Sequence, residues 1–135
     1  SKVTDAGELA GATSLARRYG DTIIIEAEIS GAEYFAGILD RLTLPLIRIE
    51  TPRAFYDYEA KYESDDTSYF CPCGLPPDIE ENLKNQSLQA FDILGTSGWG
   101  RVDFILDQAG KPWFREVNTT PGMTSHSLVP QAAAQ

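Results

Sequence analysis

The sequence predicts an α+β domain in which helices pack on a mainly antiparallel sheet. Three observations support this class. The chain has 135 residues, the size of one ordinary domain. Several β-rich runs follow one another with short connectors, and helical spacing appears before, between and after them. The predicted order is a helix, three strands, a long loop, a helix, two strands, a loop and a final helix.

A helix signal and three β-rich runs occupy the first part of the chain. Asp5 and Glu8, three residues apart, resemble a capping box, and helical spacing continues as far as Gly20. The three β-rich runs cover 22–29, 33–39 and 42–50. Because the connectors between them have only two or three residues, we expect an antiparallel meander.

The stretch 51–77 interrupts this pattern. It contains four of the six Tyr residues and both Cys residues, and it shows no sustained period. A loop of this length in a compact domain is usually functional or mobile. We therefore expect 51–77 to be a mobile loop at the functional site.

Regular patterns return after this loop. A helix is predicted over 78–94, with Gly95 as its C-terminal stop. Its inward-facing apolar residues are expected to be Ile79, Leu83, Ala90, Phe91 and Leu94. Two further strands are predicted at 99–107 and 112–118. A loop then leads to a last helix beginning near Pro130, because proline is tolerated in a first helical turn.

Composition excludes several classes of protein. The formal charge is −9, whereas a protein that binds a nucleic-acid backbone usually presents a basic face. No apolar run, 23–25 included, exceeds three residues, which is far shorter than a bilayer span, and the first residues lack the apolar core of a signal peptide. Cys71 and Cys73 are too few for a disulfide scaffold, and we interpret them as free thiols. We expect a cytoplasmic protein without nucleic-acid or membrane partners, and the missing initiator Met suggests a piece of a longer chain.

Carboxylate and amide side chains face one another across the predicted hairpin. If the loop 108–111 sets the register, Asp103 lies opposite Glu116, and Arg101 lies opposite Asn118. Two opposed carboxylates repel unless a cation or a shared proton compensates. Oxygen ligands suit Mg²⁺ or Mn²⁺, and Mg²⁺ typically completes its shell with water and substrate phosphates. The spacing indicates a nucleotide-phosphate site; the alternative is an exposed hairpin with surface ion pairs.

The loop at 119–127 follows the hairpin directly and is rich in Thr, Ser and Gly. Such a loop, leading into a helix, can offer N–H and hydroxyl groups to an anion. Gly122 lets the backbone approach a ligand closely, and Ser127 and Leu128 lie where the helix dipole favours a carboxylate. The alternative is a plain turn with a helix cap. His126, the only histidine, is a possible base or ligand, although a lone loop histidine is more often neither.

Three segments together resemble the D-alanine–D-alanine ligase family. They are 55–62 (FYDYEAKY), 98–103 (GWGRVD) and 116–130 (EVNTTPGMTSHSLVP). Three long motifs in the right order are more specific than any one of them, and the resemblance covers essentially all 135 residues. It implies the C-terminal part of an ATP-grasp fold. It further implies that ATP and two D-alanines are converted to D-alanyl-D-alanine, ADP and phosphate for peptidoglycan.

The resemblance also implies a role for individual residues. The magnesium or manganese ligands, for two ions, are Asp103, Glu116 and Asn118. The residues that hold ATP are Glu26, Ala27, Ile29, Glu33, Lys61 and Asn118. Four residues have catalytic roles. Arg101 and the Gly122 N–H stabilise the oxyanion, and Lys61 contacts the transferred phosphoryl group. Tyr62 matches the tyrosine that is found where the second substrate is D-alanine and not D-lactate. The second substrate's carboxylate is bound at Ser127 and Leu128.

Departures from the family pattern qualify these roles. Ala27 stands where the family often has Lys, and Glu28 stands where a bulky apolar or aromatic residue is common, so the purine contact differs. The N-terminal domain that binds the first D-alanine and part of the central ATP-binding domain are not in the sequence. We therefore expect residues 1–135 alone to be inactive and to bind ATP weakly, and the full-length protein to be a homodimer.

Two alternatives remain open. The first is another ATP-grasp carboxylate–amine ligase, or a ligase that makes D-alanyl-D-lactate. The second is a non-catalytic module that binds magnesium or a nucleotide.

Overall fold

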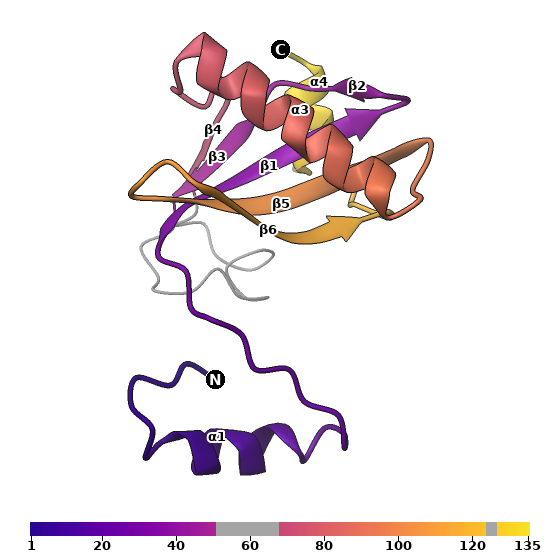
Figure 1. Cartoon of the computed structure of the whole chain (residues 1–135). Helices are drawn as coiled ribbons and strands as arrows, with labels where there is room; N and C mark the ends of the chain where they lie inside the picture. The colour runs from indigo at the N-terminus through magenta and orange to yellow at the C-terminus, as the bar shows by residue number, and fades with distance from the viewer. Residues whose placement is uncertain (51–67, 124–126) are drawn as a thin grey trace.

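The computed structural model describes residues 1–50, 68–123 and 127–135. In these residues a six-stranded, fully antiparallel sheet has the path β4-β3-β1-β5-β6, with β2 paired to β1 (Figure 1). The strands are β1 (Gly31–Leu39), β2 (Leu42–Thr43), β3 (Ile47–Glu50), β4 (Ser68–Phe70), β5 (Trp99–Asp107) and β6 (Pro112–Asn118). The helices are α1 (Leu9–Ala16), α3 (Pro77–Ile93) and α4 (Leu128–Ala133). The predicted α+β class is therefore confirmed.

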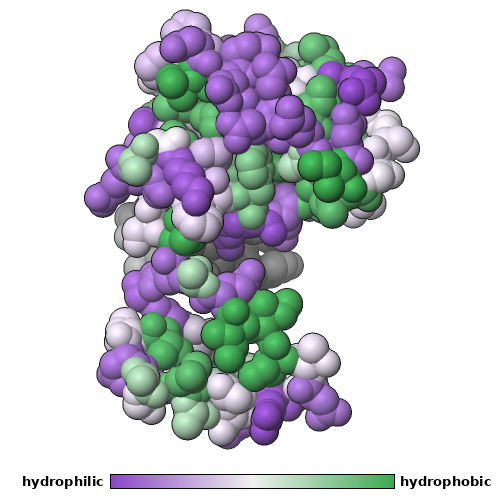
Figure 2. Space-filling model, viewed as in Figure 1, coloured by the Kyte–Doolittle hydropathy of each residue, from purple (hydrophilic) through white to green (hydrophobic). Residues whose placement is uncertain are grey.

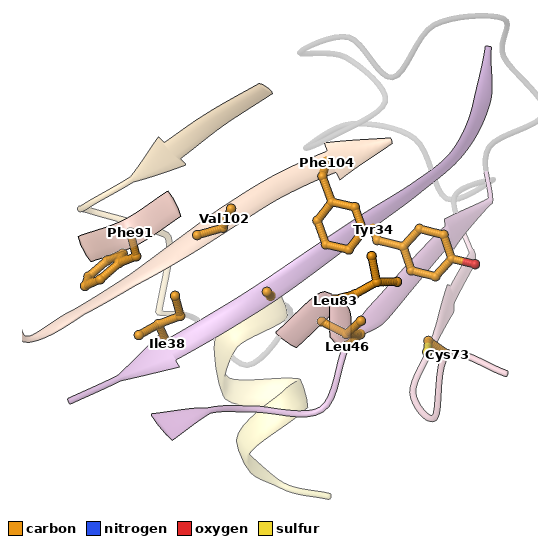
Figure 3. Close-up of a cluster of buried hydrophobic side chains, with 9 residues drawn as sticks. Tyr34, Ile38, Leu46, Cys73, Leu83, Phe91, Val102 and Phe104 are labelled. Carbon is orange, nitrogen blue, oxygen red and sulfur yellow. The ribbon is translucent and has the colours of Figure 1, made fainter. Parts of the chain in front are cut away.

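Two apolar cores lie on opposite faces of the sheet. Alternate residues of β1 point to opposite sides, so Tyr34 enters one core while Phe35 enters the other. The first core packs β1 and β5 against α3, through residues that include Leu83, Phe91 and Phe104 (Figure 3). The second core packs the opposite face against α4. This second face carries the candidate site.

The helix and hairpin predicted in the second half of the chain are confirmed. β5 and β6 have the predicted bounds, and α3 begins and ends one residue before the predicted helix. Gly95 follows α3 with φ of +70°, a backbone conformation that suits glycine at a helix end. Pro130 lies in the first turn of α4, which begins two residues before it.

The inward face of α3 differs in part from the prediction. Leu83 and Phe91 are buried, but Ile79 and Leu94 are exposed. The buried stripe instead includes Ser87, which lies one turn after Leu83 and one turn before Phe91. Its hydroxyl donates to the Leu83 carbonyl at 2.8 Å, so the buried polar group is satisfied.

The strand predicted at 22–29 is wrong. These residues form an extended segment that leads into β1, and the side chains of Ile24 and Ile25 are exposed by 82% and 68%. A strand requires a neighbour that accepts its backbone hydrogen bonds. Both edges of β1 are already paired, one with β5 and the other with β2 and β3. The meander therefore contains only β1, β2 and β3.

The strand predicted at 42–50 is divided into β2 and β3 by residues 44–46. Pro45 lies in this break, and proline cannot donate to a ladder. The chain nevertheless stays on the sheet, because Leu44 donates its N–H to the Gly37 carbonyl at 2.8 Å. Leu46 turns inward and is fully buried in the core beneath α3.

The first helix is shorter than predicted, and the hydrogen bonds of Asp5 and Glu8 lie in the turn before it: its N-cap residue, Glu8, makes no side-chain capping hydrogen bond. The Asp5 carboxylate accepts the N–H of Glu8 at 3.2 Å, and the Glu8 carboxylate accepts the N–H of Thr4 at 2.8 Å. α1 has no buried side chain, so no packing extends it to Gly20.

The predicted loop 51–77 contains regular structure near its end. β4 pairs with β3 and forms one edge of the sheet. Residues 51–67 lie outside the described residues, so the predicted mobility of the loop stays a prediction. Of the helices in the described part of the chain, none combines the length and apolar composition that crossing a bilayer requires.

Candidate active site

The predicted cross-strand register is confirmed. Asp103 lies opposite Glu116, and Arg101 lies opposite Asn118. Residues directly opposed in an antiparallel pair are the closest neighbours on one face of a sheet. The two carboxylates are therefore neighbours on the face that carries the second core.

A β-bulge produces this register. Near the turn, Leu106 pairs with Pro112 and Phe104 pairs with Phe114. Arg115 is then left as an extra residue, because Glu116 is the residue that pairs with Asp103. A bulge inserts one residue into one strand and changes the direction of the side chains around it. Without it, an unbroken register from the turn would place Arg115 opposite Asp103.

Asp103 and Arg101 form a buried ion pair. The Arg101 Nε and Nη2 donate to the two carboxylate oxygens of Asp103 at 2.7 and 2.8 Å. The side chains are only 12% and 7% exposed. The guanidinium also lies 4.4 Å from the centre of the Phe35 ring, a cation–π contact. These contacts hold the Arg101 guanidinium in one position.

Burial raises the pKa of Asp103 to about 7. Desolvation is the largest cause, because burial disfavours the charged form of the carboxyl. The Arg101 guanidinium lowers the pKa, while the Glu116 carboxylate raises it. The ionised form of Asp103 is therefore disfavoured in the folded chain, even beside the Arg101 guanidinium.

A small pocket opens beside this pair. Its lining residues are Glu33, Tyr34, Phe35, Asp103, Phe104, Arg115 and Glu116. Three of them are carboxylic acids contributed by three adjacent strands, β1, β5 and β6. Arg115 forms an ion pair across the pocket with Glu33, at 3.4 Å. The pocket therefore combines acceptors and one cation at the surface of the sheet.

The residues at the end of β6 also lie near one another. The Asn118 side-chain oxygen accepts the N–H of Thr120 at 2.9 Å, which orients the amide. Gly122 lies against Ser127, because a Cβ on Gly122 would lie 2.9 Å from the Ser127 Oγ. The structure thus brings together the predicted oxyanion donor and the predicted carboxylate site. Leu128 is buried in the second core, so only its backbone is available to a ligand.

Some predicted site residues lie apart from the pocket. Glu26, Ala27 and Ile29 are on the extended segment before β1, outside the residues that line the pocket. In the structure Glu28 forms an ion pair with Lys2 at 2.5 Å. The predicted residues Lys61, Tyr62 and His126 lie outside the described residues.

The donor set fits a divalent cation by its chemistry. Asp103, Glu116 and Asn118 offer oxygen ligands on one face of the sheet, and a cation beside them would favour the ionised form of Asp103, which burial disfavours. Within the described ranges, no three His, Cys, Asp or Glu side chains form a ready-made metal site. A cation would therefore compete with Arg101 for the Asp103 oxygens.

Two contributors to the site were missed by sequence reasoning. Phe35 could have been found, because it lies two residues after Glu33 on a strand and so shares its face. Arg115 could not have been found from alternation, because the bulge gives it its place on the pocket side.

Comparisons with known proteins are consistent along the whole chain. A family model described as the D-ala D-ala ligase C-terminus matches residues 1–135. The chain is 53% identical over 133 residues to the D-alanine–D-alanine ligase of Methylococcus capsulatus, covering 98% of this chain and 43% of that protein. It is 47% identical over 135 residues to the corresponding protein of Laribacter hongkongensis, covering all of this chain and 44% of that protein.

Solved structures agree with this result. The D-alanine–D-alanine ligase of Bacillus anthracis complexed with ATP has a TM-score of 0.82 and 31% identity, covering 98% of this chain and 42% of that chain. The VanG D-Ala:D-Ser ligase of Enterococcus faecalis has a TM-score of 0.83 and 31% identity, covering 98% and 39%. The chain spans less than half the length of the curated relatives it matches.

Proposed function

The chain belongs to the D-alanine–D-alanine ligase family, and from this membership we propose that it is the C-terminal ATP-grasp portion of an enzyme that joins two D-alanines with ATP. The observation that carries the proposal is the facing of Asp103 and Glu116 across the β5–β6 hairpin, beside the pocket. The chain corresponds to about 43% of the length of its relatives, so the first D-alanine would bind to a domain outside it. We therefore propose that residues 1–135 alone are inactive.

The proposed reaction has two steps. The carboxylate of the first D-alanine attacks the γ-phosphorus of ATP, the bond to the ADP oxygen breaks, and an acyl phosphate forms. The amine of the second D-alanine then attacks the acyl carbon, phosphate leaves, and the amine gives its proton to solvent. The first step requires mainly positioning and charge neutralisation. The second step concentrates negative charge on the carbonyl oxygen, where fixed donors stabilise it.

The second step depends on residues of β5 and of the chain after β6. We propose that Arg101, held by Phe35 and Asp103, and the Gly122 N–H donate to the oxyanion, while Ser127 receives the carboxylate of the second substrate. Losing one oxyanion donor typically lowers the rate by about 10²–10³.

The proposed nucleotide contacts lie elsewhere in the chain. Glu33 would bind the ribose, the segment from Glu26 to Ile29 would hold the adenine, and Lys61 would contact the transferred phosphoryl group. Asp103, Glu116 and Asn118 would hold Mg²⁺ or Mn²⁺, which neutralises phosphate charge when bound. We further propose a cytoplasmic homodimer for the full-length protein.

NMR titration of the ¹⁵N-labelled chain with MgATP tests the nucleotide site. We expect weak, saturable binding with shifts in β5 and β6. Asp103→Asn and Glu116→Gln should each weaken binding by at least about tenfold, the loss typical of changes around a metal site. Asp92→Asn, which removes an exposed carboxylate from α3, is the matched control and should bind like the parent. Unchanged affinity in both site variants would remove the metal assignment.

Activity is tested on the full-length protein. Phosphate release that requires D-alanine supports the ligase, whereas a chain that releases no phosphate with any amino acid is a binding module. The alternative is a different second substrate, because the VanG D-Ala:D-Ser ligase, with a TM-score of 0.83, is as similar in structure as the D-alanine–D-alanine ligase with a TM-score of 0.82. Product analysis with D-alanine, D-serine and D-lactate separates these, and Tyr62→Phe should shift the product toward the ester if Tyr62 selects D-alanine.

A further inference from the structure

Arg115 has a position that strand alternation does not give. It is the extra residue of the bulge in β6, between Phe114, which pairs with Phe104, and Glu116, which pairs with Asp103. Phe114 contacts the ring of Phe104 in the first core, so its side chain lies on the α3 face. Arg115 instead lines the pocket on the opposite face together with Glu116.

From this position Arg115 reaches a residue two strands away. Its Nη1 lies 3.4 Å from the Oε1 of Glu33, and Glu33 belongs to β1, on the far side of β5. Adjacent strands are about 4.8 Å apart, so the side chain spans roughly 10 Å of sheet. Few side chains other than arginine are long enough to make this contact. The Glu33 side chain is 23% exposed and that of Arg115 is 46% exposed, so the pair is partly shielded from water.

The charges around the pocket indicate what the Arg115–Glu33 contact does. Glu33, Asp103 and Glu116 are three acids in one lining, and Arg101 is already paired with Asp103. Arg115 is the one guanidinium among the described residues that line the pocket. A carboxylate that binds a pair of sugar hydroxyls must be ionised and fixed in orientation, because it accepts both hydrogen bonds. A neighbouring guanidinium promotes both conditions.

We propose that Arg115 is a positioning residue for the nucleotide: it orients Glu33 so that its carboxylate accepts hydrogen bonds from the ribose hydroxyls of ATP. The inference rests on the proposed function, because Glu33 is assigned to the ribose there. Arg115 acts through Glu33 and touches neither the transferred phosphoryl group nor the oxyanion. Its contribution to affinity therefore depends on the presence of ribose hydroxyls in the ligand.

Two nucleotides test this dependence. The ¹⁵N-labelled chain and its Arg115→Met variant are titrated by NMR with MgATP and with the magnesium complex of 2′,3′-dideoxy-ATP, which lacks both ribose hydroxyls. We expect the variant to bind ATP about two- to fivefold more weakly, the range for a partly exposed ion pair, and to bind dideoxy-ATP like the parent. Arg115→Lys should recover part of the ATP affinity. Arg41→Met removes an exposed arginine that pairs with Asp92 away from the pocket, and it should change neither affinity.

The outcomes separate this inference from the proposed function. An equal loss for both nucleotides would mean a phosphate contact or a structural role, and it would overturn the inference alone. Unchanged ATP affinity in Arg115→Met would also overturn the inference alone. If the parent chain binds neither nucleotide, the nucleotide site itself and the inference both fail. Dispersed NMR spectra of each variant establish that it is folded.

Discussion

Asp103 is a buried acid next to a second acid, and its protonation is therefore coupled to folding. Its pKa is raised from 3.8 to about 7, mainly by desolvation. Between these two values the native state binds a proton that the unfolded state has released. The free energy of unfolding therefore falls as pH rises through this window.

This coupling predicts the effect of Asp103→Asn on the pH dependence of stability. The parent chain should lose stability between about pH 4 and pH 7, by at most about 4 kcal/mol, because one pKa unit corresponds to about 1.4 kcal/mol. The variant cannot ionise at this position and should show a flatter profile. Urea unfolding at pH 5 and pH 7.5 measures the difference. Asp21→Asn, at an exposed position, should reproduce the parent profile; an equally steep profile in Asp103→Asn would contradict the coupling.

Individual site residues were predictable to different degrees. Asp103, Glu116 and Asn118 follow from alternation, because each shares a face with its partner on a short hairpin. The buried ion pair between Arg101 and Asp103 was not predicted. Alternation places both side chains on one face of the sheet, but it does not determine that they form an ion pair. Arg115 was hidden by the bulge.

At the scale of elements, the β5–β6 hairpin depends on one side chain in its turn. The Asp107 carboxylate accepts N–H groups from Ala109 and Lys111, each at 2.9 Å, and the indole N–H of Trp113 at 2.9 Å. These hydrogen bonds lower the pKa of Asp107, with the Trp113 contact as the largest cause. The Lys111 ammonium also lies 3.9 Å from the centre of the Trp113 ring.

We therefore expect Asp107→Ala to loosen the hairpin selectively. Amide hydrogen exchange in β6 should become faster while exchange in β1 and α3 stays near the parent values, because the change frees the turn without opening the core. Asp107→Asn keeps one acceptor oxygen, so amide exchange in its β6 should be faster than in the parent and slower than in Asp107→Ala. The lowered pKa adds a pH effect: the carboxylate's contribution is present above the ordinary Asp pKa and is lost as pH falls through the lowered value. Equal exchange in parent and Asp107→Ala would contradict this role.

The same hairpin shows why the register was predicted correctly for an incomplete reason. The loop 108–111, taken alone, predicts that Asp103 and Glu116 are opposed along an unbroken ladder. In the structure the pairing next to the turn is shifted by one residue, so that Leu106 and not Asp107 lies opposite Pro112. The bulge at Arg115 shifts the pairing back, and Asp103 again lies opposite Glu116. Two local deviations cancel, and neither has a sequence signal as strong as the Gly or Pro of a common turn.

Strand prediction failed where a partner or a donor was missing. The run 22–29 has strand composition, but a strand exists only beside another strand, and neither edge of β1 is open to it. The run 42–50 has the right partner, but Pro45 interrupts it. Composition reports the preference of a segment, whereas pairing depends on the rest of the sheet.

At the scale of the whole molecule, the N-terminal segment 1–30 differs from the sheet and its helices. None of its side chains is buried, and α1 lies apart from the sheet at the end of an extended connection (Figure 1). Apolar side chains gather on the surface of this segment (Figure 2). The exposed large apolar residues in it are Leu9, Leu15, Tyr19, Ile24 and Ile25. Burial that stabilises the described chain therefore comes almost entirely from residues after 30.

This distribution predicts that a chain lacking residues 1–29 keeps its stability. Both cores are built from residues of the sheet, the β2–β3 and β4–α3 connections, α3 and α4, and β1 begins only at Gly31. Side chains that remain exposed gain nothing on folding, so their removal should change the free energy of unfolding by less than about 1 kcal/mol. Urea unfolding of the shortened and parent chains measures this, with Phe104→Ala as a destabilised reference expected to lose about 3–5 kcal/mol. A loss in the shortened chain comparable to that of Phe104→Ala would mean that the segment packs on the sheet in solution. Binding of the dye ANS should also fall on deletion, because the apolar surface of the segment is removed with it.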